Sequence, residues 1–206
     1  GANFLPPLCI AARNGFYELC QTLLLAGANV HFADKQGNTA LLIASKHGHV
    51  KIVSLLLSKS VDVNSGNSVK KVDSEGNSSL HLACAGGHEE VASLLLNASE
   101  DLIDVANGKN LTALQIALAN GHSRVAAVLK ALVDKREREK KLTRSDSDIK
   151  EAAKLWCSNP AAAERQFGHI SDWNTASVTN MRELFKNAKD FNADLSGWSV
   201  GSVTDM

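Results

Sequence analysis

Histidine and cysteine side chains are the groups in this 206-residue chain that first suggest chemistry, because they bind metals and act as nucleophiles. The seven histidines include two close pairs, His47 with His49 and His81 with His88. A metal site needs ligands that converge on one point. His49, His88 and His122 instead each follow a glycine in similar segments, so we interpret them as residues that begin helices. We expect no metal and no other cofactor.

The four cysteines are Cys9, Cys20, Cys84 and Cys157, and their wide spacing fits neither a metal clip nor a dense disulfide framework. Free, mostly buried thiols are predicted, which favours a reducing compartment and a cytoplasmic location. Cys9 and Cys84 fall on predicted apolar faces, where a thiol stays protonated and inert. The sequence also lacks a phosphate loop and the common hydrolase and zinc-protease motifs. We therefore predict a protein that is not an enzyme and has no catalytic residues.

The charges of the chain balance, with 22 Lys and Arg against 22 Asp and Glu. A nucleic-acid-binding protein usually carries a basic excess, so nucleic acid is not an expected partner. No apolar run approaches the roughly 18 residues that a membrane span needs. A protein partner remains as the expectation, without membrane insertion, and the oligomeric state is left open.

A repeated segment supplies the elements that would position these side chains. The run that starts at Gly37, GNTALLIASKHGHVKIVSLLL, recurs 39 positions later from Gly76 and again from Asn110, and an earlier copy starts at Pro6. Each copy has apolar residues at helical spacing, a glycine, and a second apolar stripe. In three copies Thr or Ser precedes the first helix and can cap it. The pattern predicts four helical hairpins over about residues 4–132.

These segments resemble the ankyrin repeat, whose period is about 33 residues and whose signature is Thr-Pro-Leu-His-x-Ala. His81 keeps the signature histidine, whereas Cys9, Leu42 and Gln115 replace it in the other copies. The resemblance implies a mainly α fold, an ankyrin-repeat solenoid of four repeats. It also implies that the loops between repeats, called fingers, form a concave face with the first helices and bind a protein. The extra residues of the second connection fall at 64–71 and predict a lengthened finger.

Positions of this face that have no evident packing role are the candidate partner-binding residues. The second repeat is basic here and the third is neutral to acidic, so we expect a partner with an acidic patch. The candidates are Arg13, Asn14, Lys35, Gln36, Asn38, Lys46, His47, Ser74, Glu75, Asn77, Lys109, Leu111 and Asn120.

Residues 134–147 have alternating charges and a polar composition, which predicts a charged linker between an ankyrin domain at 1–133 and a second region at 148–206. Asp148, with Glu151 three positions later, predicts a capped helix. Asn159 followed by Pro160 predicts the start of another short helix.

A different period of 25 residues relates Trp173 to Trp198 and Met181 to Met206. The apolar residues from Met181 to Ala188 predict a short amphipathic helix. Residues 170–206 resemble the BspA-like, leucine-rich-type repeat of surface proteins, preceded by a helical segment. Because the second copy is incomplete, we expect the chain to be a fragment of a longer repeat protein.

Three classes of function are consistent with this organisation. The first is a non-enzymatic scaffold that binds a partner protein through the ankyrin array. The second is a fragment of a surface or adhesion protein in which the leucine-rich-like repeats dominate, and glycans at Asn97 would favour it. The third is a regulatory segment of a larger enzyme whose catalytic residues lie outside residues 1–206.

Overall fold

The computed structural model describes residues 5–59, 68–186, 188–189 and 191–206. The chain divides into two compact units, Gly1–Ala131 and Leu132–Met206, which we call unit 1 and unit 2. Helix α8, Ser123–Leu142, begins in unit 1 and ends in unit 2.

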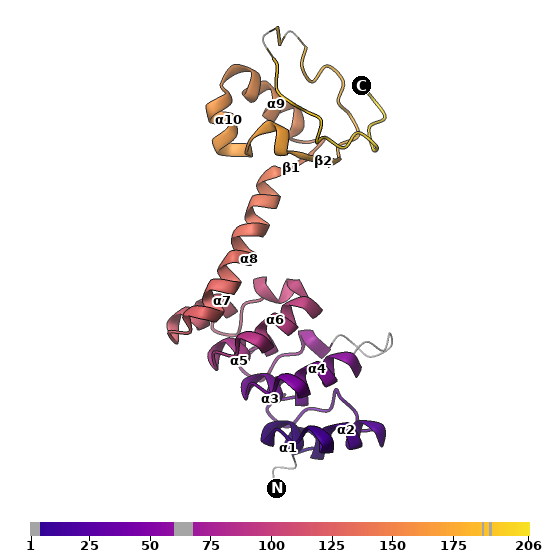
Figure 1. Cartoon of the computed structure of the whole chain (residues 1–206), viewed down its shortest axis with the longest axis vertical. Coiled ribbons are helices and arrows are strands. Elements are labelled where there is room, and N and C mark those ends of the chain that lie inside the picture. Colours follow the sequence, from indigo (N-terminus) through magenta and orange to yellow (C-terminus); the bar gives the residue numbers. More distant parts are fainter. Residues whose placement is uncertain (1–4, 60–67, 187, 190) are drawn as a thin grey trace. The chain divides into compact units, whose positions relative to one another are not determined.

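Unit 1 is a stack of four helical hairpins (Figure 1). The first helices of the hairpins pack against one another in chain order, and α4 packs against both α2 and α6. The predicted mainly α solenoid of four repeats is confirmed. The hairpins pair α1 (Pro7–Asn14) with α2 (Tyr17–Leu25), α3 (Ala40–Lys46) with α4 (Val50–Lys59), α5 (Ser79–Ala85) with α6 (Glu89–Ala98), and α7 (Ala113–Ala119) with α8.

Helices of seven to ten residues are marginal alone, so they depend on caps and on burial against neighbours. The predicted caps Thr39, Ser78 and Thr112 each accept a hydrogen bond from a backbone N–H of the first turn. The apolar stripes of the second helices are buried, as at Ile52 and Leu56. Local sequence therefore marks the start of α3, α5 and α7, and stacking against neighbours stabilises the helices.

Two 3-10 turns precede the later hairpins, η1 at Ser68–Lys70 and η2 at Glu100–Asp104. The lengthened finger predicted at 64–71 lies partly outside the described residues, because the structure describes this connection only from residue 68 onward.

Unit 2 has a short parallel pair of strands and two helices around an aromatic core. Strand β1 (Thr143–Ser145) pairs with β2 (Asn174–Ser177). The core includes Ile149, Trp156 and Trp173. The remaining elements are α9 (Ile149–Ser158), α10 (Pro160–Phe167) and the 3-10 turn η3 (Ile170–Asp172).

Of the two helix caps predicted in unit 2, one forms and the other does not. Asn159 does cap α10, because its side chain accepts from the N–H of Ala162. Asp148 precedes α9 but makes no side-chain cap. Its carboxylate is occupied instead by the guanidinium of Arg144, at 2.9 Å, and by the backbone N–H of Ser145.

The prediction of an amphipathic helix from Met181 to Ala188 is wrong. Residues 182–186 form turns, and Glu183 has a φ of 59°, which a right-handed helix does not allow. The N–H of Met181 donates to the carbonyl of Asp205, 2.7 Å away. Met181 thus pairs with the next 25-residue segment, and the residues that follow it form turns in place of a helix.

Successive 25-residue segments lie side by side in unit 2. Asn180 and Asp205 form a parallel bridge, and the hydroxyl of Thr175 donates to the carbonyl of Ser199. The rings of Trp173 and Trp198 stack with centroids 5.9 Å apart. The period in the sequence therefore corresponds to one turn of a repeated structure.

The polar segment 134–147 is more structured than its composition indicates. It comprises the end of α8, strand β1 and a turn. Arg144 is only 3% exposed, with its guanidinium over the rings of Phe167 and Trp173. The carboxylate of Asp146 accepts from the N–H groups of Thr179 and Asn180. The composition gave no indication of these contacts, and the predicted domain limits stay predictions.

Candidate protein-binding surface

Each finger of unit 1 is organised by one side chain at its start. Asp34, Asp73 and Asn107 occupy equivalent positions. Each accepts through Oδ1 from the N–H groups two and four residues later, at 2.8–3.0 Å. An isolated antiparallel bridge closes each finger, as between Ala33 and Thr39. The fingers are therefore tight turns of fixed shape.

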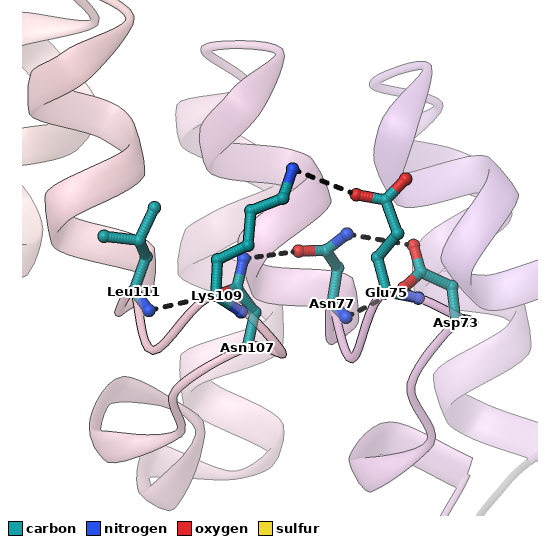
Figure 2. A network of polar contacts seen from close by, with 6 residues as sticks. All are labelled: Asp73, Glu75, Asn77, Asn107, Lys109 and Leu111. Atoms are coloured by element: carbon teal, nitrogen blue, oxygen red, sulfur yellow. Dashed lines mark hydrogen bonds and ion pairs between the residues drawn. The ribbon is translucent and has the colours of Figure 1, made fainter.

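Neighbouring fingers are also bonded to one another. The N–H of Ser74 donates to the carbonyl of Gln36 at 2.8 Å, and the N–H of Gly108 donates to that of Glu75 at 2.9 Å. Figure 2 shows the side chains between the fingers that precede α5 and α7, where Asn107 donates to Asn77 at 2.8 Å. The fingertips thus form one continuous hydrogen-bonded row.

The histidines that begin the second helices link successive repeats. The ring Nε2 of His49 lies 3.1 Å from the carbonyl of Arg13. His88 and His122 make the same contact with the carbonyls of Lys46 and Ala85. In the described part of the chain, no group of three potential ligands could hold a metal ion. These rings satisfy carbonyls at the ends of the preceding first helices.

Both ring nitrogens of the buried signature histidine have partners. Nδ1 of His81 lies 2.7 Å from the hydroxyl of Ser78, and Nε2 lies 3.0 Å from the carbonyl of Leu111 in the next finger. The thiol of Cys9 replaces this interaction in the first repeat with a long contact to the carbonyl of Asn38, 3.9 Å away. His81 therefore bonds the third repeat to the fourth more firmly than Cys9 bonds the first to the second.

The buried environment of His81 makes part of the stability of unit 1 sensitive to acid. Burial lowers the pKa of His81 below its ordinary value of 6.5. The unfolded chain then takes up a proton at a higher pH than the folded chain, so the contribution is complete above pH 6.5 and is lost as the pH falls below it. We expect His81→Gln to flatten the pH dependence of stability, because glutamine does not titrate and Gln115 already makes the equivalent cap. Amide exchange in α5, measured on both sides of that pH, tests this, and equal pH dependence in both proteins would contradict it.

The thirteen candidate residues all remain accessible. Eleven are exposed, whereas Asn38 and Asn77 are half-buried. The side-chain amides of these two donate to the carboxylates of Asp34 and Asp73. They consequently have a structural role that the sequence interpretation did not assign, as do the two aspartates. The recurrence of Asp-x-x-Gly-Asn before the capping residue was the signal for that role.

The structure brings several basic candidates into one electrostatic neighbourhood. Desolvation lowers the pKa of His47, and the nearby charges of His49, Lys46 and Arg13 lower it further. The expected acidic character of the third repeat is weaker, because Glu75 forms an ion pair with Lys109 at 3.4 Å (Figure 2). Positive charge is therefore concentrated on the first two repeats.

The thiols have no evident chemistry. All four cysteines are free, and three are buried. Burial raises the pKa of Cys84 to about 12 and that of Cys9 to about 11, with Asp34 adding to the rise at Cys9. Both remain protonated at neutral pH and are poor nucleophiles.

Stacked hairpins with bonded fingers define unit 1 as a helical-repeat domain of the protein-interaction class. Comparison with known families shows which one: the profile described as ankyrin repeats matches residues 8–104 and 65–144. The chain belongs to the ankyrin-repeat family. A second profile, described as a Mycoplasma protein of unknown function, DUF285, matches residues 158–206.

Two curated relatives match short stretches of the chain. The nuclear factor NF-kappa-B p105 subunit of Gallus gallus is 38% identical over 68 residues, which is 31% of this chain. The ankyrin repeat and KH domain-containing protein mask of Drosophila melanogaster is 41% identical over 59 residues, or 28% of this chain. The chain covers only 7% and 2% of these relatives.

Proposed function

We propose that this protein is a non-enzymatic interaction scaffold that binds a partner protein along the concave face formed by its fingers and first helices. The continuous row of bonded fingers is the observation that supports this proposal best. A surface whose backbone is already fixed loses little conformational entropy on binding. Its exposed side chains, among them Lys35, Gln36 and Ser74, remain available for contacts.

The chemistry of this face favours a partner with an acidic patch on the first two repeats. Arg13, Lys35 and Lys46 are exposed, and none of them forms an ion pair with another described residue. An acidic partner would gain attraction here without first breaking internal pairs, and the attraction would also speed association.

Reversing charge on this face tests the proposal. The double variant Lys35→Glu/Lys46→Glu is expected to weaken partner binding by about tenfold at physiological salt, because each change replaces attraction by repulsion. Proteins retained by the immobilised chain would be quantified by mass spectrometry, and the dissociation constant of the purified partner would then be measured. Lys51→Glu is the matched control, since Lys51 is an exposed lysine on α4. Equal retention by both variants would refute the proposal.

Unit 2 is proposed to be a BspA-like leucine-rich-type repeat that supplies a second recognition surface or a spacer. Its stacked 25-residue segments support this assignment and also keep the surface-protein alternative open. The four free thiols favour a reducing compartment and hence the cytoplasm. In the described residues, no helix has both the length and the apolar composition needed to cross a bilayer.

A further inference from the structure

A cavity of about 860 Å³ lies within unit 2, between α9 and the turns that follow Met181. Helix α9 supplies Lys150 and Lys154 to its wall, and the turns supply Arg182 and Phe185. The volume falls in the range of ligand-binding sites.

The described residues that line this cavity are strongly basic. Five of them carry a positive charge and one, Glu183, carries a negative charge. Glu183 is already paired with Lys186, at 2.7 Å. Lys154 and Arg182 are exposed and form no ion pair with another described residue. In a chain whose formal net charge is zero, this is a local excess that an anionic ligand would neutralise.

The remaining wall is aromatic. Phe185 and Phe191 stack with centroids 4.2 Å apart, and both are half-buried. The largely buried ring of Trp156 lines the same space. An apolar side chain bound here would remove its own surface and that of the rings from water. The cavity therefore suits a ligand that combines carboxylates with an apolar group.

We propose that this cavity binds an acidic polypeptide segment that carries an apolar or aromatic residue between carboxylates. Four of the five cations are lysines, whose flexible side chains would each lose conformational freedom to enclose a compact anion. An extended segment meets them one at a time along α9 and the turns. This site belongs to unit 2 and does not depend on the face proposed for unit 1.

Fluorescence anisotropy of the full chain tests this with a labelled peptide, Asp-Glu-Phe-Asp-Glu-Leu. We expect it to bind, and its amide counterpart, Asn-Gln-Phe-Asn-Gln-Leu, to bind much more weakly. Lys154→Glu/Arg182→Glu should weaken binding of the acidic peptide by about tenfold or more, with a marked dependence on salt. Lys46→Glu and Lys51→Glu should leave binding unchanged, because Lys46 belongs to the proposed face of unit 1 and Lys51 to α4.

Cys157 provides a second readout that is local to the cavity. It is an exposed thiol on the cavity wall, whereas Cys9, Cys20 and Cys84 are buried. Maleimide should therefore label Cys157 selectively, and the bound peptide should slow that labelling. Full-rate labelling at saturating peptide would overturn the proposal, as would unchanged binding by the Lys154→Glu/Arg182→Glu variant.

Two further outcomes would also overturn it. Loss of binding in Lys46→Glu alone would assign the peptide to unit 1. Displacement by inorganic phosphate at equal concentration would show a site for compact anions instead.

Discussion

Replacing Trp173 with alanine is expected to lower the free energy of unfolding of unit 2 by about 3–5 kcal/mol. Trp173 is 1% exposed and contacts the rings of Trp156, Phe167 and Trp198 at centroid distances of 5.9–6.3 Å. Its indole N–H donates to the carbonyl of Gly168 at 3.1 Å. Alanine would leave a cavity at the centre of this cluster and remove the ring beneath the guanidinium of Arg144.

Tryptophan fluorescence can follow the unfolding of unit 2 on its own. The chain has three tryptophans, all in unit 2, so Trp156 and Trp198 report urea unfolding of unit 2 by fluorescence in the Trp173→Ala variant. Trp198→Ala is the matched control, because Trp198 is only half-buried and its loss should cost about half as much. A small domain is stable by only about 5–15 kcal/mol, so a loss of this size is a substantial fraction of the stability of unit 2. Equal costs for the two variants would contradict the central position of Trp173.

The fold of unit 1 was predictable because its information is local and repeated. Caps such as Thr39 and Ser78, and apolar stripes at helical spacing, recur in each copy and stand for the same contacts. A repeat contacts only its neighbours, so recognising one unit predicts the stack. The sequence did not show how the fingers are held, because Asp34 and Asn38 resemble ordinary exposed polar residues until their mutual hydrogen bonds are seen.

Unit 2 was less predictable, because its polar segment is held by residues far away in the sequence. Arg144 lies in a polar segment, yet it is buried by Phe167 and Trp173, which are more than twenty positions away. Asp146 binds Thr179 across 33 positions. Composition reports local tendency and carries no information on such distant partners. The helix expected after Met181 is absent from the described residues: Met181 bonds to Asp205 in the following 25-residue segment, and Glu183 has a left-handed backbone.

The candidate binding face was predicted from equivalent positions in successive repeats. Those positions alone could not show which of the candidate residues interact with one another. It located Lys35 and Lys46 on one face, but the grouping of Arg13 with His47 depends on the packing of the first two repeats. The neutralisation of Glu75 by Lys109 likewise depends on how two fingers meet. Both interactions join residues 34 positions apart, about one repeat length.

Substituting alanine for Gly48 is expected to destabilise unit 1 more than the same substitution at Gly121. Both glycines have the left-handed backbone that ends a first helix, with φ of 73° and 74°. A Cβ at Gly48 would lie 2.5 Å from Nδ1 of His88, whereas a Cβ at Gly121 has nothing within 4 Å. Gly121→Ala should therefore cost about 1–2 kcal/mol for backbone strain alone. Gly48→Ala should cost about 1–2 kcal/mol more, because His88 must turn away from the carbonyl of Lys46.

A double-mutant cycle separates the strain from the displaced histidine. In a His88→Ala background the ring is absent, so adding Gly48→Ala should cost only what Gly121→Ala costs in the unaltered chain. Urea unfolding followed by far-UV circular dichroism gives these values, with tryptophan fluorescence identifying the phase that belongs to unit 2. If Gly48→Ala cost the same with and without His88, the histidine contacts between repeats would not be what makes glycine necessary at this position. A shrinking cost would instead show that the glycine and the histidine of the next repeat act as one unit, which ties the geometry of each helix end to the stacking of its neighbour.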